Sequence, residues 1–230
     1  MKEWHVTRAV QAVYDHMPKA LGLVRCGERH GILYELAEGQ DLLFLIRKAP
    51  LRLLTAGKML AELHVEIHKK EIGGILSVRE KLRQEIGRAG ELTEKEKQEI
   101  TDRLLRLPVR GRLCHFDFHP GNIMISGGHV SVLDWLTACS GDPAADIART
   151  CLLLKYGELR NGDRVSGLIL RVVKACVRRS YMRNVLRLSG VTRNEVLQWT
   201  VPVAAARLSE WLTEHEKARL LRLIRDALQA

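Results

Sequence analysis

The sequence predicts an α+β fold in which a small β-containing part at the N-terminal side joins a larger, mostly helical body. Three observations predict this layout. One hairpin pattern lies near residue 30, a second lies near residue 127, and apolar residues recur at helical spacing through most of the remaining chain. At 230 residues the chain is long enough for one large domain or two small ones, and it contains no internal repeat.

The N-terminal part is predicted to contain one helix followed by one hairpin. Residues 4–16 carry apolar side chains on one side of the helix, and Pro18 ends it. Residues 21–26 and 32–36 flank a polar turn that contains two glycines, which is typical of a β-hairpin. Gly39 ends the second strand.

The body is predicted to be built from helices. Residues 93–107 open with a capping box, in which Thr93 precedes Glu96 by three positions, and Pro108 ends that helix. The other helical segments, marked by apolar residues at intervals of three and four, are 42–46, 56–67, 75–88, 144–156, 165–188, 192–212 and 214–229.

The composition excludes several classes of protein. No apolar run approaches the roughly 18 to 20 residues of a membrane span, and the first residues lack the uninterrupted apolar stretch of a secretion signal. The five cysteines are scattered and form no C-x-x-C pair, so neither a disulfide framework nor a zinc knuckle is expected. We therefore expect a cytoplasmic protein with reduced cysteines.

The net charge of +10 is concentrated toward the C-terminal end, where residues 160–230 contain 14 Lys or Arg and 6 Asp or Glu. Such a bias also occurs in proteins that bind nucleic acid or anionic surfaces. Here the charges alternate with apolar residues at helical spacing and few aromatic residues accompany them, which favours solvated helix faces. We expect neither nucleic acid nor a membrane as a partner, although the positive charge is compatible with binding of an anionic nucleotide.

Residues 112–135 carry the most informative pattern. Two strand-like segments, 123–126 and 130–133, flank a glycine pair of the kind that closes a two-residue hairpin. Counting outward from this turn brings Asn122 and Asp134 together at the open end. Opposed positions in such a ladder lie roughly 5 Å apart, so an amide oxygen and a carboxylate can share one hard cation.

A third polar residue, Asp117, precedes Asn122 by five positions. Pro120 and Gly121 between them predict an irregular loop that can return the Asp117 carboxylate toward the same point. Phosphoryl transfer needs metal ligands that hold the nucleotide phosphates and a carboxylate that orients the acceptor hydroxyl and takes its proton. A loop Asp with a downstream Asn and Asp supplies both.

This pattern resembles a known family. His115, Asp117, Asn122 and Asp134 are similar to the H-x-D-x-x-x-x-N catalytic loop and the metal-binding Asp of the aminoglycoside phosphotransferase and choline kinase family. Three further segments resemble the family over residues 20–155. They are the hinge strand at 34–39, the helix at 63–68, and the G-D-P-x-x-D segment at 140–150, in which Asp142 or Asp146 would brace the loop.

The resemblance implies a protein-kinase-like fold. Residues 1–39 would form a truncated N-terminal lobe with a β-hairpin and hinge, and residues 40–230 a mostly helical C-terminal lobe. That lobe would carry the catalytic-loop hairpin at 112–135 and a helical tail on the substrate side. The implied activity is the transfer of a phosphoryl group from ATP, with Mg²⁺, to the hydroxyl of a small-molecule alcohol such as an aminoglycoside or choline.

The family motif also implies individual roles. Asp117 would be the catalytic base, and His115 would stabilise the loop. Asn122 and Asp134 would bind the metal ion, while His119 would support the loop or border the acceptor. The backbone of the hinge residues Glu35, Leu36 and Ala37 would meet the adenine. One position departs from the family, because Phe116 stands where glycine is usual.

One part of the family pattern is missing. A complete kinase-like N-terminal lobe has a glycine-rich hairpin over the phosphates and a strand lysine paired with a helix glutamate. Only Lys2 and Lys19 precede the first predicted hairpin, neither on a strand ahead of the helix, and Glu3 is a doubtful counterpart of the glutamate. Losing such a clamp lowers transfer rates by about 100-fold or more. Three explanations stay open: a truncated or mis-started enzyme, a naturally shortened kinase, and a noncatalytic binding or scaffold module.

The remaining polar residues admit other kinds of site. His115, Asp117 and His119 alternate as they would in a hydrolytic metal site, but Pro120 opposes a continuous strand. His64 and His68 are four apart on a helix, yet the spacing H-x-E-x-H is not that of a zinc protease, so partly exposed packing residues are expected.

Two pairs near the C-terminal end admit a role in acceptor binding. Trp199 and Trp211 could line an acceptor pocket, although core packing is favoured. Glu210 and Glu214 could attract a cationic acceptor, although a solvated helix face is favoured.

Overall fold

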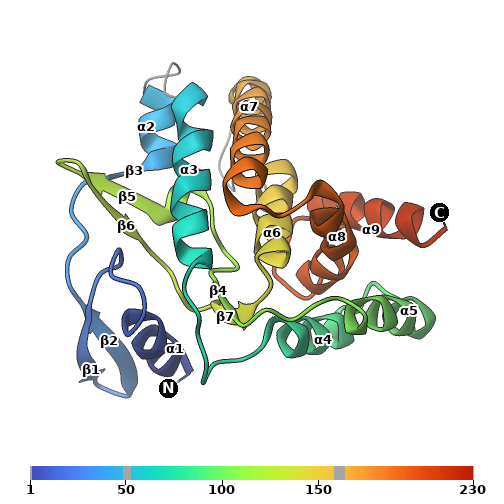
Figure 1. The fold of residues 1–230 in the computed structure, drawn as a ribbon, viewed down its shortest axis with the longest axis horizontal. Coiled ribbons are helices and arrows are strands. Elements are labelled where there is room, and N and C mark those ends of the chain that lie inside the picture. Colours follow the sequence, from blue (N-terminus) through green and yellow to red (C-terminus); the bar gives the residue numbers. More distant parts are fainter. Residues whose placement is uncertain (1, 49–52, 158–163, 230) are drawn as a thin grey trace.

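The computed structural model describes residues 2–48, 53–157 and 164–229, without the side chains of 53, 54 and 164–171. Figure 1 shows a small N-terminal unit of one helix and one hairpin at one end of the molecule and a group of helices at the other. A short hairpin and two long helices lie between them. The α+β class predicted from the sequence is therefore confirmed.

The N-terminal unit consists of helix α1 (Lys2–Gln11), strand β1 (Ala20–Cys26) and strand β2 (Arg29–Tyr34). The helix ends five residues before the predicted end at 16. Its last residue, Gln11, accepts a hydrogen bond at its side-chain oxygen from the Ala20 N–H, 2.9 Å away. The chain thus leaves the helix early, because the start of β1 is tied to the helix end.

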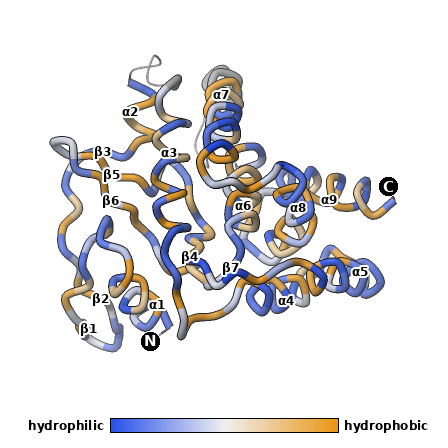
Figure 2. The backbone as a smooth tube through the Cα atoms, viewed as in Figure 1, coloured by the Kyte–Doolittle hydropathy of each residue, from blue (hydrophilic) through white to orange (hydrophobic). Residues whose placement is uncertain are grey.

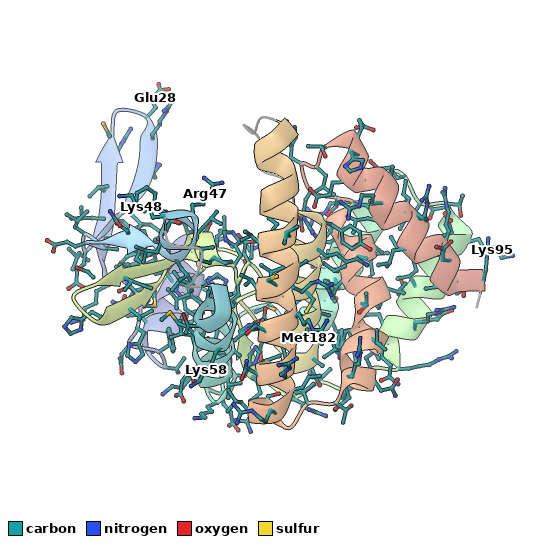
Figure 3. The ribbon with its side chains drawn as sticks, turned by 90° about the horizontal axis from the view of Figure 1, so that it is seen from above. Glu28, Arg47, Lys48, Lys58, Lys95 and Met182 are labelled. Atoms are coloured by element: carbon teal, nitrogen blue, oxygen red, sulfur yellow. The ribbon has the colours of Figure 1, made fainter. Side chains whose placement is uncertain are left out.

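Strands β1 and β2 form a two-stranded antiparallel sheet in which Cys26 pairs with Arg29. The second strand begins three residues earlier than predicted. Gly27 has a positive φ of 60°, which allows a two-residue turn and lets the chain pair again at once. The hairpin projects from the body with Glu28 at its tip (Figure 3).

A second sheet has the order β3 (Gln40–Asp41), β5 (Ile123–Ser126) and β6 (His129–Val132). Ser126 pairs with His129, and the pairing continues to Ile123 with Val132, which confirms the register counted from the glycine turn. Gly39 is required beside this sheet, because a Cβ atom there would lie 2.1 Å from the Ile125 carbonyl oxygen. A third sheet pairs β4 (Arg112–Cys114) with β7 (Cys139–Gly141).

The predicted helices are present, and several of their ends are shifted by two to five residues. Helix α4 begins at Val78 instead of 75, because Ser77 caps it by accepting from the Glu80 N–H. Helix α8 ends at Arg207 instead of 212. The remaining helices are α2 (Leu42–Lys48), α3 (Leu53–His68), α5 (Glu94–Leu105), α6 (Pro143–Tyr156), α7 (Arg164–Ser189) and α9 (Glu214–Gln229), while α4 ends at Arg88 and α8 begins at Arg193.

The core lies where α3, α6 and α7 meet. Helices α3 and α7 lie side by side, and α6 is buried along most of its length between them and α8 (Figure 1). Figure 2 shows apolar stretches in these central helices, and the polar residues of α4 and α5 lie toward the outside. Within the described part of the chain, no helix is long and apolar enough to cross a membrane.

Candidate active site

The predicted catalytic loop runs from β4 to β5 and contains the expected irregular turn. Residues Pro120–Asn122 form a single 3₁₀ turn, whose first N–H groups need a partner. His119 supplies it, because its Nδ1 atom accepts a hydrogen bond from the Gly121 N–H at 3.0 Å. His119 therefore caps this turn of the loop, and its role in acceptor binding stays a prediction.

Asn122 and Asp134 both lie at the open end of the β5–β6 hairpin, directly beyond the last pair of its ladder, Ile123 with Val132. The Leu133 N–H donates to the Asn122 carbonyl oxygen at 2.8 Å, one residue before Asp134. The Asp134 backbone has a φ of 58°, in the left-handed region. Its carboxylate is exposed and forms no hydrogen bond or ion pair with any residue that the structure describes. The carboxylate is thus available to an external ligand.

The carboxylate of Asp117 is held beside the same hairpin. The Asn122 Nδ2 atom donates to the Asp117 carbonyl oxygen at 2.9 Å and to its Oδ2 at 3.3 Å. His119 Nε2 lies 3.7 Å from Oδ2, and Arg149 Nη2 lies 3.9 Å from Oδ1. The side chain is 26% exposed, so it can be reached from solvent. The structure brings Asp117 to Asn122, as two members of the predicted set, and adds His119 beside them, whereas Asp134 contacts neither Asp117 nor Asn122 by a hydrogen bond or ion pair within the described residues.

His115 lies under the loop and is fully buried. Its Nε2 donates to the Leu133 carbonyl oxygen at 2.9 Å, and its Nδ1 accepts from the Asp117 N–H at 3.2 Å. These two bonds require the neutral Nε2–H tautomer. Burial lowers the pKa of His115, which keeps the ring in this neutral form. The ring therefore joins the loop to the end of β6.

Of the two candidate braces, Asp146 holds the loop. Its Oδ2 accepts from the His115 N–H at 2.6 Å, and its Oδ1 accepts from the Phe116 N–H at 2.9 Å. Burial alone would raise the pKa of Asp146, but His64 and His68 hold it well below its usual range. Asp142 has a different role, because it caps α6 by accepting from the Ala144 N–H.

The expectation that His64 and His68 are partly exposed is wrong. Both rings are buried, because they turn inward to the Asp146 carboxylate. Their Nε2 atoms lie 2.9 and 3.2 Å from Asp146 Oδ2, and the Tyr181 hydroxyl lies 2.6 Å from His64 Nδ1. The two rings and the carboxylate are close enough to share a metal ion, but the same contacts serve as a brace for the loop. The H-x-E-x-H spacing, which places both histidines on one face of α3, was the sequence feature that could have indicated this pair.

Phe116, where the family usually has glycine, adopts a glycine-like backbone with a φ of 64°. Two hydrogen bonds and the burial of its ring hold it there. Its N–H donates to Asp146, its carbonyl oxygen accepts from Arg149 Nε at 3.0 Å, and its ring is buried with Lys81 Nζ 5.6 Å from the ring centre. The left-handed conformation is thus fixed by the surrounding groups and not by the residue type.

The sequence did not indicate Arg149 as part of the site, and it offered Glu210 only as the less favoured alternative of attracting a cationic acceptor. Arg149 is buried on α6, and its Nη1 donates to Glu210 Oε1 at 2.5 Å. Burial alone would lower the pKa of Arg149, but the Glu210 carboxylate raises it. Residues 208–210 leave α8 through short i to i−3 hydrogen bonds, which bring Glu210 to Arg149. The solvated face expected for Glu210 is therefore wrong, whereas Glu214 is exposed as expected.

The two tryptophans behave differently. Trp199 is fully buried, which confirms its place in the core. Trp211 is 76% exposed, because it follows the turn that ends α8, so core packing is wrong for it. Trp211 directly follows Glu210, the partner of Arg149, in the chain.

The predicted hinge, Glu35 to Ala37, follows β2 directly. The Glu35 N–H donates to the Lys19 carbonyl oxygen at 2.9 Å, so it is already used within the sheet. The Leu36 and Ala37 N–H groups bond to no residue within the described ranges, and Leu36 is 86% exposed. The hinge backbone is therefore open to a ligand from residue 36 onward.

The fold and the braced loop together define a protein-kinase-like phosphotransferase architecture. The model of the phosphotransferase enzyme family matches residues 2–167. The chain belongs to this family. No curated protein matches it significantly in sequence.

Solved structures agree on the fold. A thermostable mutant of aminoglycoside phosphotransferase APH(4)-Ia with ADP and hygromycin B superposes with a TM-score of 0.64 at 16% identity, over 97% of this chain and 82% of the other. Amicoumacin kinase hAmiN with AMP-PNP and Ca²⁺ gives 0.59 at 12% identity, over 98% and 75%. Choline kinase from Cryptosporidium parvum gives 0.55 at 12% identity, over 99% and 77%. At these identities the likeness establishes the protein-kinase-like fold alone.

Proposed function

We propose that this chain transfers the γ-phosphoryl group of ATP, in the presence of Mg²⁺, to the hydroxyl of a small-molecule alcohol. The observation that supports this proposal most is the position of the Asp117 carboxylate beside the Asn122 side chain. The Asn122 carbonyl oxygen in turn accepts from the N–H of Leu133, the residue before Asp134. The proposal assigns Asp117 as the base, and Asn122 and Asp134 as metal ligands.

The oxygen atoms of Asn122 and Asp134 fit a magnesium ion. The amide nitrogen of Asn122 is committed to Asp117, and no described residue donates to its Oδ1. The exposed carboxylate of Asp134 is likewise without a partner in the described ranges. Hard cations such as Mg²⁺ prefer carboxylate and amide oxygens. A bound Mg²⁺ would neutralise part of the charge on the nucleotide phosphates.

Asp117 would orient the acceptor. Its carboxylate would accept the proton of the attacking hydroxyl while the new bond forms from that oxygen to phosphorus and the bond to the ADP oxygen breaks. The Asn122 amide and the Arg149 guanidinium fix the direction of the carboxylate. Its partial exposure leaves one side open to an incoming alcohol.

The nucleotide and the acceptor would approach from different sides. The Ala37 N–H and the Glu35 carbonyl oxygen are the hinge groups that could meet adenine, with Leu36 between them. The acceptor would enter on the side of Glu210 and Trp211. That alcohol would be bound between the loop and the end of α8, where polar and aromatic groups are both available.

A second candidate is a nucleotide-binding module without transfer activity. The observation that favours it is that neither β1 nor β2 carries a lysine, so these strands supply no ammonium group to the phosphates. The two candidates share the metal ligands and differ in the use of Asp117.

Calorimetric titration of Mg–ATP into the chain, its Asp134→Ala variant and its Asp117→Asn variant tests the proposal. We expect metal-dependent binding to the first, a loss of affinity of at least about tenfold in Asp134→Ala, and near-normal binding to Asp117→Asn. ADP release should then be measured over a panel of alcohols, with Asp117→Asn as the matched control. Release that depends on Asp117 supports the enzyme, binding without release supports the module, and the absence of metal-dependent binding overturns both.

A further inference from the structure

A cavity of about 690 Å³ lies between α6, α7, α8 and α9, away from the catalytic loop. None of the predicted site residues lines it. Asp146, Arg149 and Thr150 on α6 bond to the loop, whereas Ala148, Leu152 and Lys155 of the same helix line the cavity. The catalytic loop and the cavity thus lie on different faces of α6.

The floor of this cavity is apolar. Leu152, Tyr156 and Val196 are buried there, and Met182 and Leu186 of α7 are half-buried. Figure 3 shows Met182 on α7, between that helix and the C-terminal helices. A volume in this range and an apolar lining are usual for sites that hold small molecules.

The rim of the cavity is cationic. The five basic residues that line it are Lys155, Arg178, Arg179, Arg183 and Arg193. No acidic residue is among its described lining, and none of the five forms an ion pair with a residue in the described part of the chain. Some exposed arginines elsewhere are paired, since Arg83 and Arg103 each pair with a glutamate on their own helix.

This arrangement creates an unbalanced field. Several like charges around one concave site raise the local concentration of anions, while their mutual repulsion remains uncompensated until an anion binds. A smaller neighbouring cavity, lined by Arg219, Arg222 and one acid, Asp226, extends the cationic area past Tyr156. The excess of basic residues noted between 160 and 230 thus gathers partly around one site instead of being spread over solvated faces.

We propose that this cavity binds a small anionic amphiphile, with an apolar body on the floor and a carboxylate or phosphate at the arginine rim. Both parts of the site are needed for this assignment, because the floor selects an apolar body and the rim selects negative charge. Such a ligand comes either free in solution or as the headgroup end of an anionic lipid. The proposal does not depend on phosphotransferase activity.

Decyl phosphate below its critical micelle concentration is the probe. Calorimetric titration into the full chain is expected to show saturable binding near one to one. Inorganic phosphate tests charge alone and should bind at least about tenfold more weakly, and decyltrimethylammonium, which has the same tail and opposite charge, should not bind measurably. Equal binding of the two amphiphiles, or no binding of decyl phosphate, overturns the proposal.

The double variant Arg179→Ala/Arg183→Ala locates the site. Its matched control is Arg88→Ala/Lys95→Ala, which removes the same number of charges from exposed positions on α4 and α5; Lys95 lies far from α7 in Figure 3. We expect the affinity for decyl phosphate to fall at least tenfold in the first variant and less than twofold in the control. Equal losses would show a general effect of net charge and overturn the site.

Two further arms complete the test. Saturating Mg–ATP should not displace decyl phosphate, and displacement would place the ligand in the catalytic site and overturn the assignment. Flotation with neutral vesicles, with and without anionic lipid, distinguishes the sources of the ligand. Binding to anionic vesicles that is lost in Arg179→Ala/Arg183→Ala supports a lipid headgroup, and binding of the monomer alone supports a free amphiphile.

Discussion

The catalytic loop and the β1–β2 hairpin are both short segments built around a turn, but different interactions stabilise them. In the loop, buried backbone groups of His115 and Phe116 bond to one carboxylate, Asp146. In the hairpin, Leu21 and Leu23 are 58% and 46% exposed, and most of the contacts that its strands make within the described residues are with each other and with α1.

This difference shows which residues determine each conformation. The loop conformation depends on side chains distant in the sequence. Helix α6 supplies Asp146, Arg149 and Thr150, which bond to buried backbone groups of the loop, and α3 supplies the two histidines that contact Asp146. The hairpin conformation is determined locally, by a two-residue turn that contains Gly27. Substitutions that remove one buried partner should therefore have large effects in the loop, and substitutions on the open face of the hairpin should have small ones.

The largest effect is expected for Asp146→Asn. An amide places a donor against the backbone N–H groups of the loop and removes the charge that the two histidines face, so unfolding free energy should fall by about 3 to 5 kcal/mol. Urea denaturation measures it. Asp142→Asn on the same helix is the matched control and should change stability by less than about 1 kcal/mol, because Asn caps helices as well as Asp does. Equal losses in the two variants would contradict the brace.

The next effect concerns pH. Burial, and then the charge of His68, lowers the pKa of His64 from 6.5 to about 4. In the unfolded chain this ring takes a proton below about pH 6.5, while in the folded chain it stays neutral, so stability is lost as pH falls from about 6.5 toward 4. The contribution is about 3 kcal/mol over that window. Unfolding free energies at pH 7, 5.5 and 4.5 should show a flatter profile in His64→Gln, and an unchanged slope would refute this assignment.

A smaller and more specific effect is expected at Phe116. Removing the buried ring destabilises the loop by about 3 to 5 kcal/mol, but glycine also relieves the left-handed backbone by roughly 1 kcal/mol. Phe116→Gly should therefore be more stable than Phe116→Ala by about 1 kcal/mol. At Phe118, which is buried without a positive φ, the order should reverse. The same order at both positions in urea denaturation would argue against backbone strain at Phe116.

The smallest effect is expected in the hairpin. Leu23→Thr and Leu33→Thr exchange apolar side chains on exposed strand positions for a residue that strands accept well. Each should change the unfolding free energy by less than about 0.5 kcal/mol. A loss above 1.5 kcal/mol at micromolar protein that shrinks on dilution would mean that this face is covered in solution, and the contrast with the loop would then disappear.

Much of the loop could be predicted from the sequence because its constraints are local. The glycine pair at 127 and 128 fixes the hairpin register, and the register brings Asn122 to Leu133. The capping box of Thr93 and Glu96 is likewise present as predicted. In both cases the interacting residues are close in the chain, so spacing alone determines geometry.

The parts that were missed depend on distant contacts. The burial of His64 follows from Asp146, which lies on another helix, and the position of Glu210 follows from Arg149. Spacing on one helix does not say which partner its face will meet. The chemical roles of Asp117, Asn122 and Asp134, the hinge groups and the lobe boundary between residues 39 and 40 stay predictions.

The contact between His64 and Tyr181 forms late during synthesis of the chain. His64 Nδ1 meets the Tyr181 hydroxyl across 117 residues of chain. At synthesis rates of about 5 to 20 residues per second, the tyrosine follows the histidine roughly 6 to 23 seconds later. During that interval the ring that supports the loop lacks its partner on α7. On the ribosome, this contact of the brace therefore forms only after the residues of the catalytic loop have been made.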